Sequence, residues 1–188
     1  YLLSYDGVPI MEIYSNKPAQ VSESELGVAV VQIPTDWQAF EPELGNFTIQ
    51  IPPNLELLES IEEFEDTIVY IYADLTGEEI YSIFYSDLPP ETTANPNGSQ
   101  GILIYIRDFW IGLIGGTLIE ERSISLGDHP GKEFIADSEL NGQPIKNKTR
   151  LYLVENRYYY QITVGVPRDR SFTVEQEAFL QSFELLEE

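Results

Sequence analysis

Catalysis based on histidine would depend on one residue of this chain. His129 is the only histidine, so a triad of the serine–histidine–carboxylate type would have to use it with a serine nucleophile. It lies in segment 127–131, Gly-Asp-His-Pro-Gly, whose composition is typical of a turn. The Gly-x-Ser-x-Gly pattern of a nucleophile elbow does not occur. We therefore interpret His129 as a structural turn residue and predict that the protein is not an enzyme.

The densest run of acidic residues lies between positions 59 and 66. Hard cations such as calcium bind where several oxygen ligands converge on one point. Alternation along an extended strand would divide these carboxylates between opposite faces, and the EF-hand pattern is absent. We therefore predict a solvated acidic surface and no cofactor. A weak site for calcium or another divalent cation is kept as an alternative, with these candidate ligands: Glu62, Glu63, Glu65 and Asp66.

Several other kinds of site are excluded by residue type or spacing. The chain has no cysteine, which excludes disulfides, thiolate catalysis and cysteine-ligated zinc or iron–sulfur centres. Gly112, Gly115 and Gly116 match neither the dinucleotide-binding fingerprint nor the phosphate-binding loop. Glu120 and Glu121 are adjacent carboxylates, but neighbours on a strand point to opposite faces, so they do not indicate glycoside hydrolysis.

Acidic and basic residues are unevenly distributed along the chain. The 188 residues include 32 acidic and 10 basic side chains, a formal net charge of -22. Residues 1–106 contain 18 acidic residues and one basic residue, Lys17, whereas residues 107–188 contain 14 acidic and 9 basic residues. Nucleic acids and anionic membranes both require a basic surface, so we expect neither to bind. We predict instead an acidic face that binds a protein partner, a basic one.

Short strands separated by turns are predicted for most of the chain after Trp37. Apolar residues alternate with polar ones over residues 47–51, which is the period of a half-buried strand. β-branched and aromatic residues are concentrated at 68–72 and 80–85, which we expect to pair as a hairpin across Gly77. Further strands are predicted at 117–126, 132–137, 149–154 and 158–164, the last two joined as a hairpin through residues 155–157.

Two helices interrupt these strands. Apolar residues that recur every three or four positions predict a helix at 99–113, with Ser99 as its N-cap. Thr173 and Gln176 have the spacing of a capping box, which predicts a second helix at 174–181. No apolar run approaches the roughly 20 residues that a membrane-spanning helix needs. Strands interrupted by single helices indicate an α+β domain with a central antiparallel β-sheet.

Tyrosines are concentrated in the predicted strands, at positions 70, 72, 81, 85 and 158–160. Tyrosine suits half-buried strands, so we interpret these side chains mainly as sheet faces that pack against a helix. The alternative is a small-ligand or lipid-binding carrier, in which tyrosines line a pocket walled by the helix at 102–113.

Four sequence features, in this order and spacing, resemble one known family. Trp37 and Phe40 precede the segment Gly-Asn-Phe-Thr-Ile-Gln-Ile-Pro at 45–52. The turn Gly-Asp-His-Pro-Gly-Lys-Glu follows at 127–133. The third feature is Arg-Leu-Tyr-Leu-Val at 150–154, which leads into Arg-Tyr-Tyr-Tyr-Gln-Ile at 157–162. The last is Phe-Leu-Gln-Ser-Phe at 179–183. Over residues 35–185 the chain resembles the PsbP/Mog1-like fold family, especially its small bacterial and cyanobacterial members.

This resemblance implies a fold, a class of function and a location. The fold would be a central antiparallel sheet flanked by helices, an α/β/α sandwich, spanning residues 35–188 after an N-terminal extension at 1–34. Members of the family are mostly non-catalytic: some are photosystem II extrinsic subunits, one binds a small nuclear-transport GTPase, and many are uncharacterised secreted or lipid-anchored proteins. We therefore expect an accessory or interaction module, extracytoplasmic (periplasm, thylakoid lumen or secreted) or associated with photosynthesis.

Overall fold

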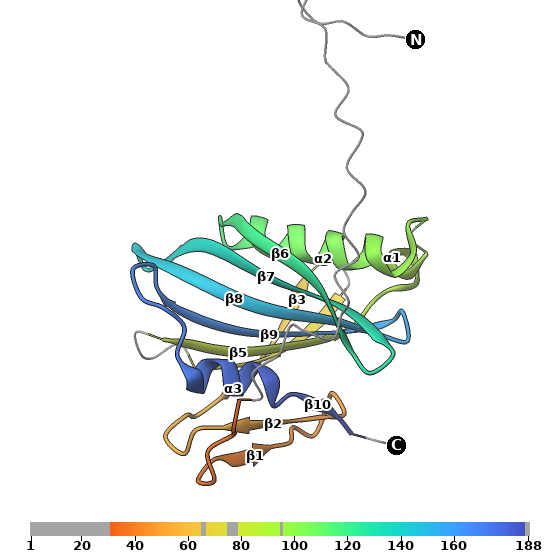
Figure 1. Ribbon diagram of the computed structural model, residues 1–188. Helices are drawn as coiled ribbons and strands as arrows, with labels where there is room; N and C mark the ends of the chain where they lie inside the picture. The colour runs from red at the N-terminus through yellow and green to blue at the C-terminus, as the bar shows by residue number, and fades with distance from the viewer. Residues whose placement is uncertain (1–30, 65–66, 75–78, 95, 187–188) are drawn as a thin grey trace, which may run out of the picture. The chain divides into compact units, whose positions relative to one another are not determined.

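The computed structural model describes residues 31–64, 67–74, 79–94 and 96–186. They form ten strands and three helices (Figure 1). The first half contains β1 (Gln38–Phe40), β2 (Phe47–Ile51), β3 (Leu58–Phe64), β4 (Thr67–Asp74), β5 (Ile80–Asp87), α1 (Pro90–Thr93) and α2 (Gly98–Leu113). The second half contains β6 (Thr117–Leu126), β7 (His129–Leu140), β8 (Gln143–Val154), β9 (Tyr158–Pro167), α3 (Val174–Gln181) and β10 (Glu184–Leu185). The predicted extension at 1–34 lies almost wholly outside the described residues and stays a prediction.

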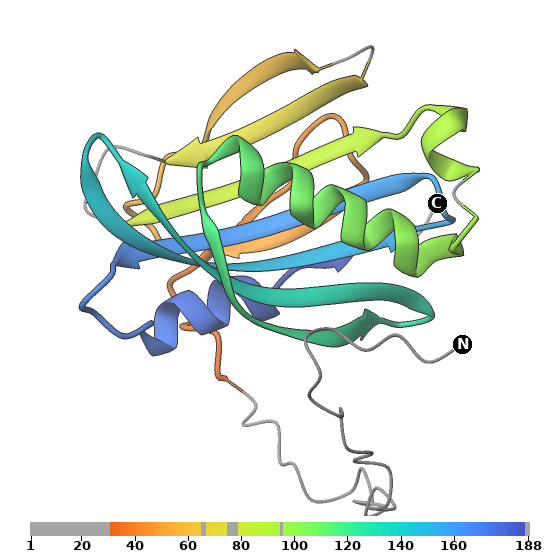
Figure 2. The same cartoon turned by 90° about the horizontal axis from the view of Figure 1, so that it is seen from above.

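Seven strands form one antiparallel sheet in the order β3-β4-β5-β9-β8-β7-β6. Neighbours along the chain pair through hairpins, as expected for strands with short turns between them. The exception is the pairing of β5 with β9, which joins segments far apart in the sequence. Figure 2 shows the β3–β4 hairpin, in yellow and orange, at one edge of the sheet and β6 at the opposite edge. The first and second halves of the chain therefore meet in the middle of the sheet.

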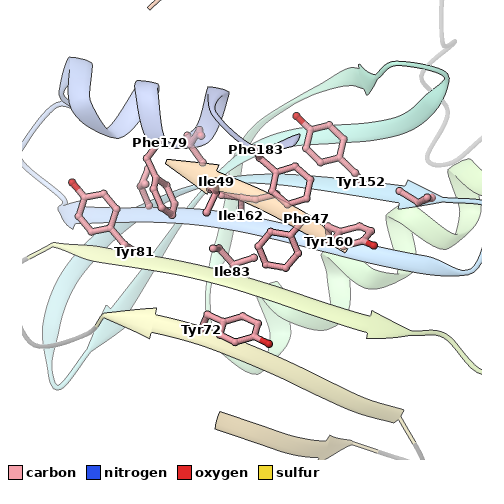
Figure 3. Close-up of a cluster of buried hydrophobic side chains, with 13 residues drawn as sticks. Phe47, Ile49, Tyr72, Tyr81, Ile83, Tyr152, Tyr160, Ile162, Phe179 and Phe183 are labelled. Atoms are coloured by element: carbon pink, nitrogen blue, oxygen red, sulfur yellow. The ribbon is translucent and has the colours of Figure 1, made fainter. Parts of the chain in front are cut away.

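One face of the large sheet packs against α3 and a small sheet of order β1-β2-β10. Phe47 of β2 and Phe179 of α3 are fully buried at the centre of this core. The Phe47 ring lies 6.0 Å from that of Tyr160 and 5.3 Å from that of Phe183, and the Phe179 ring contacts Tyr81 edge-on at 5.2 Å (Figure 3). Aromatic packing thus joins β2 and α3 to β5 and β9 of the large sheet.

The opposite face packs against α2, which crosses the strands obliquely (Figure 2). The helix buries four residues on one stripe, at the three- and four-residue spacing of an amphipathic helix: Ile102, Leu103, Ile106 and Trp110. Trp110 lies 4.5 Å from the ring of Phe84 on β5. The helix ends where Gly115 adopts a positive φ of 60°, which places the Gly116 amide 2.8 Å from the Ile111 carbonyl oxygen.

These elements confirm an α+β domain built mostly from antiparallel sheet. The helices at α2 and α3 match those predicted, and Thr173 and Gln176 form the expected reciprocal capping box. The predicted cap of α2 was wrong: Asn97 holds the N-cap position, without a side-chain cap bond, and Ser99 Oγ instead donates to Asn156 Oδ1 in the β8–β9 turn. The contact ties the helix start to the sheet.

Three further differences concern strands and loops. The segment at 87–100 is rich in proline, asparagine, threonine and serine, a composition that predicts a loop, but it contains α1 and the start of α2. The acidic run forms a regular strand, β3, because Leu58, Ile61 and their neighbours pair residue by residue with β4. The turn after β6 is shorter than expected, since β7 already begins at His129. Within the described ranges, no helix is long and apolar enough to cross a membrane.

Candidate functional site

His129 lies at the first position of β7, where it pairs with Leu126 across the hairpin from β6. The turn residue before this hairpin, Gly127, has a positive φ of 56°. No hydrogen bond or ion pair joins His129 to a serine or carboxylate among the described residues. His129 thus begins a strand directly after the two-residue turn, and no triad assembles at this position among the described residues.

The predicted cation ligands are separated by the strand on which they lie. Glu62 and Glu63 are exposed neighbours on β3, opposite Val69 and Ile68 of β4. Successive side chains of a strand point to opposite faces, so these two carboxylates do not converge. Glu65 and Asp66 lie outside the described residues. No group of three or more candidate ligands gathers within the described part of the chain, and the cation site stays a prediction.

The strand β3 forms one edge of the large sheet. Among the described strands its only neighbour is β4, so its other side offers backbone amide and carbonyl groups to a further strand. Its side chains combine charge with apolar surface: Glu59, Glu62 and Glu63 are exposed, and so are Leu58 (59%) and Ile61 (60%). We call β3 with these five residues the acidic edge.

The basic residues of the domain are mostly neutralised by partners on the other half of the sheet. Glu133 of β7 accepts hydrogen bonds from Arg150 and Arg122, both at 2.8 Å, and lies 3.7 Å from Lys148. Burial alone would raise the pKa of Glu133, but the hydrogen bond from Arg150 and the nearby positive charges lower it. This cluster joins β6, β7 and β8.

A second cluster repeats this arrangement on the α2 side of the sheet. Glu121 of β6 accepts a hydrogen bond from Lys132 at 2.8 Å and forms an ion pair with Arg107 of α2. Burial opposes ionisation here too, yet the two cations lower the pKa of Glu121. At least seven of the nine basic residues after position 106 form ion pairs within the described residues: Arg107, Arg122, Lys132, Lys148, Arg150, Arg157 and Arg168.

The carboxylates at described positions before 64 lack such partners in the same part of the chain. None of the described acidic side chains between Asp36 and Glu63 forms an ion pair within the described residues. Glu59 instead faces the hydroxyl of Tyr72, and burial together with this carboxylate raises the pKa of Tyr72 to about 12. Because β3, β4 and β5 occupy one side of the sheet, the uncompensated charge is concentrated there.

Most of the tyrosines singled out in the predicted strands lie in the core or in an open depression. Tyr72, Tyr81, Tyr159 and Tyr160 are buried, as the packing interpretation predicted, and burial raises the pKa of each. Tyr70 and Tyr85 stack at 5.8 Å and line a depression of about 930 Å³ that also includes Asp87 and Arg157. Asp87 and Arg157 form an exposed bidentate ion pair there.

A separate cavity of about 520 Å³ lies beneath the C-terminal half of α2. Trp110, Ile111 and Ile114 form its roof, and side chains of the large sheet form its floor. We call it the α2 cavity. Its floor includes Gln161, Thr149 and Thr163, which the sequence did not single out. The signal in the sequence that could have indicated them was the presence of polar residues at alternate positions of strands that are otherwise apolar.

Comparison with known proteins identifies the fold. No family model and no curated protein sequence matches the chain. Among solved structures, cyanobacterial PsbP (CyanoP) from Synechocystis sp. PCC 6803 matches with a TM-score of 0.57 and 12% identity, over 85% of this chain and 95% of that one. LpqN, involved in cell envelope biogenesis of Mycobacterium tuberculosis, matches with a TM-score of 0.42 and 12% identity, over 84% and 82%. A protein of unknown function from Pseudomonas aeruginosa, PA94, gives 0.38 and 13%, over 71% and 85%.

Proposed function

Starting from the PsbP/Mog1-like fold of this chain, we propose that the domain is a non-catalytic accessory module that binds a basic, extended segment of a protein partner along the acidic edge. The observation that carries the proposal is the coincidence of three properties on β3. The strand is an edge of the sheet, its carboxylates have no ion-pair partners among the described residues, and it exposes two large apolar side chains.

Charge would give this surface its preference for a partner. Glu59, Glu62 and Glu63 lie within one strand, while the described basic residues lie on α2 and across the second half of the sheet, mostly paired. A basic segment is therefore attracted to the acidic edge without meeting a fixed cation. Exposed charges are screened over a Debye length of about 8 Å at physiological ionic strength, so binding should weaken as salt rises.

Backbone and apolar groups would supply the part of the affinity that salt does not remove. An extended segment can add to an exposed strand through main-chain hydrogen bonds, with specificity from alternate side chains. Leu58 and Ile61 lie on opposite faces of β3, so an added strand would find an apolar contact on either face. Soluble proteins usually protect such edges, often with charge, and here the charge has one sign.

Peptide binding tests this function directly. We expect a fluorescent peptide of about ten residues that alternates lysine with valine to bind the domain, measured by anisotropy at low salt. The triple variant Glu59→Gln, Glu62→Gln and Glu63→Gln should weaken binding about fivefold, the sum of three exposed charge pairs. A matched peptide with glutamate in place of lysine should not bind.

A control variant separates the acidic edge from net charge. Glu120→Gln, Asp128→Asn and Asp169→Asn change the net charge equally at exposed positions away from β3, and this variant should bind as the original chain does. The proposal is wrong if both triple variants weaken binding equally, or if raising the salt leaves the affinity of the original chain unchanged.

The remaining parts of the proposal concern architecture and location. α2, the large sheet and α3 would be the three layers of an α/β/α sandwich, with the small sheet extending the α3 layer. An extracytoplasmic location is supported by the PsbP-like fold. The carrier alternative, a tyrosine-lined pocket walled by the helix at 102–113, would use the space of about 200 Å³ lined by Tyr105, Phe109 and Tyr159. The cation alternative would use Glu62, Glu63, Glu65 and Asp66, of which the last two lie outside the described residues.

A further inference from the structure

The α2 cavity lies between the C-terminal half of α2 and the large sheet. The helix crosses the strands obliquely, so its C-terminal half leaves space above one corner of the sheet (Figure 2). The volume of about 520 Å³ lies within the range of roughly 300–1,000 Å³ that is usual for small-molecule sites. Leu58 and Ile114, both exposed, lie at its rim, so the space communicates with the surface.

The walls of the α2 cavity are apolar. Phe84, Trp110 and Phe134 contribute aromatic surface from β5, α2 and β7. Ile80, Ile111 and Ala136 complete the walls. Ile80 and Ala136 are buried at 8% and 1% exposure, so this lining is fixed by the packed sheet and not by a mobile surface. Such a surface favours an occupant that is mainly hydrocarbon.

A row of buried polar side chains crosses the floor. Ser82, Thr163 and Thr149 occupy directly opposed positions on β5, β9 and β8. The two threonine hydroxyls lie 2.9 Å apart and hydrogen-bond to each other. One step along the sheet, Asn147 Nδ2 donates to Ser138 Oγ at 2.8 Å. The two threonines, and likewise Asn147 and Ser138, thus satisfy one another, as buried polar groups normally do.

Gln161 is different from its neighbours on the floor. Its side chain is 5% exposed, and its Oε1 atom has no hydrogen-bond partner among the described residues. Leaving a buried amide oxygen unpaired is unfavourable, and such groups are rare in native proteins. Because Gln161 lines the α2 cavity, a molecule in that space can supply the missing donor.

A glycine on β9, Gly165, keeps the space beside this row free of a side chain. A Cβ atom on Gly165 would lie 2.8 Å from Asn147 Oδ1 and 2.9 Å from Ile80 Cδ1. Any side chain at this position would therefore displace two residues that line the cavity. Glycine here serves a close approach, not a turn.

The charges around the α2 cavity select against an anionic occupant. Among the described residues, its charged lining consists of Glu59 and Glu139, both exposed. No basic side chain of the described residues lines it, and the buried Lys132 is paired with Glu121. A carboxylate or phosphate placed on the floor would have neither water nor a cation to stabilise it, which is strongly unfavourable.

We infer that the α2 cavity binds an uncharged, mainly apolar small molecule whose hydroxyl or amide N–H donates a hydrogen bond to Gln161 Oε1. The hydrocarbon part of this ligand occupies the apolar space beneath Trp110 and Ile111. The α2 cavity meets the acidic edge at Leu58 and Glu59, but its polar floor lies on β5, β8 and β9. Dye binding at this floor and peptide binding along β3 are measured separately, so either proposal can fail without the other.

Three matched probes test the chemistry of the ligand. The dye Nile red, which is uncharged and fluoresces in apolar surroundings, is bound first and then displaced by 1-decanol, 1-methoxydecane or decanoate at neutral pH. We expect decanol to displace the dye at about fivefold lower concentration than the methyl ether, because only the alcohol donates a hydrogen bond. Decanoate should be the weakest competitor.

Variants locate the binding within the cavity. Gln161→Leu should still bind Nile red but should lose the preference for decanol over its ether. The exposed control Gln143→Leu should retain both the binding of the dye and this preference. Ala73→Phe, at a lining position, should weaken binding of the dye, whereas Ala39→Phe on exposed β1 should not. Thermal unfolding of each variant shows whether it folds. If Gln161→Leu does not fold, Ala73→Phe still tests whether the dye binds in the cavity.

The proposal is overturned if Nile red does not bind the original chain or if the two alanine variants bind it equally. It is also overturned if decanoate competes best, since that would require a cation. Equal competition by decanol and its ether in the original chain would remove the role of Gln161.

Discussion

Glu133 shows how single residues of this protein join elements through charge. Its carboxylate is 7% exposed, and the three cations around it come from β6 and β8. Two of these cationic side chains also form hydrogen bonds with α3: Arg150 donates to the Leu180 carbonyl oxygen at 3.1 Å, and Lys148 donates to the Glu177 carboxylate at 2.6 Å. The sheet and the helix are thus connected through one carboxylate as well as through the aromatic core.

Removing this carboxylate should destabilise the domain in a pH-dependent way. We expect Glu133→Gln to lower the free energy of unfolding by about 3 kcal/mol at neutral pH, because it leaves Arg150 and Lys148 without their shared partner. The folded pKa of Glu133 is lowered, so its contribution is present above the ordinary value of 4.5 and is lost as the pH falls through the folded value. Urea unfolding of both proteins should therefore converge below pH 4.5.

An exposed carboxylate provides the comparison. Asp128→Asn, in the β6–β7 turn, should change the free energy of unfolding by less than about 0.5 kcal/mol at either pH. A difference between Glu133→Gln and the original chain that grows under acid would contradict the assigned role.

Among the secondary-structure elements, the hairpins show where local sequence and local geometry agree. The β7–β8 turn uses Asn141 and Gly142 at positive φ values of 52° and 77°, residues well suited to a two-residue hairpin turn. The β8–β9 turn has the same left-handed pair at 54° and 55° but uses Glu155 and Asn156. Glutamate is unfavourable in this conformation, so this turn is the less stable of the two.

Replacing the strained residue should stabilise the hairpin. We expect Glu155→Asn to raise the free energy of unfolding by up to about 1 kcal/mol, because asparagine tolerates the left-handed region. Asn156 is retained, since its side chain accepts the hydrogen bond from Ser99. The change is measured by denaturant unfolding.

The reverse substitution at the other turn is the control. Asn141→Glu should destabilise the domain by a similar amount, because it recreates the unfavourable pairing at a position of the same conformation. If Glu155→Asn is neutral while Asn141→Glu is destabilising, strain at Glu155 is not the cause.

At the scale of the whole domain, the sheet topology turns a sequence asymmetry into a spatial one. The acidic first half supplies β3, β4 and β5, and the second half supplies the four remaining strands. Ion pairs therefore form around β6, β7 and β8, while the carboxylates at the β3 edge stay unpaired within the described residues. Concentrated charge of one sign favours solubility but opposes compactness.

Salt should therefore stabilise this protein. Raising the ionic strength from about 0.01 M to 1 M shortens the Debye length from about 30 Å to 3 Å, which screens repulsion between exposed carboxylates. We expect the Tm to rise over this range. The rise should be smaller in the variant with Glu59→Gln, Glu62→Gln and Glu63→Gln, whose acidic edge is neutral.

The comparison is made with the charge-matched variant at positions 120, 128 and 169. Its salt response should remain closer to that of the original chain, because these carboxylates are spread over the domain. A fall in Tm with salt in the original chain would mean that the ion pairs at Glu121 and Glu133 outweigh the repulsion.

Local signals in the sequence determined the local structure. The alternation at 47–51, the capping box of Thr173 and Gln176 and the hairpin at 155–157 each depend on residues a few positions apart, and the structure confirms all three. The uneven charge and the missing catalytic motifs were also visible without coordinates. Family resemblance over residues 35–185 indicated the PsbP/Mog1-like fold that the structural comparison supports.

Only the tertiary structure decided which distant residues meet. The pairing of β5 with β9 brings Ser82 beside Thr163, and β8 adds Thr149, so a polar row forms from three separate segments. The same pairing places β3 at an open edge. The spacing of apolar residues along a strand specifies the face of the sheet on which each side chain lies. It does not specify which residue lies beside it on the neighbouring strand, because strand order is set by packing of the whole sheet against its helices. The α2 cavity and the acidic edge are both consequences of that order.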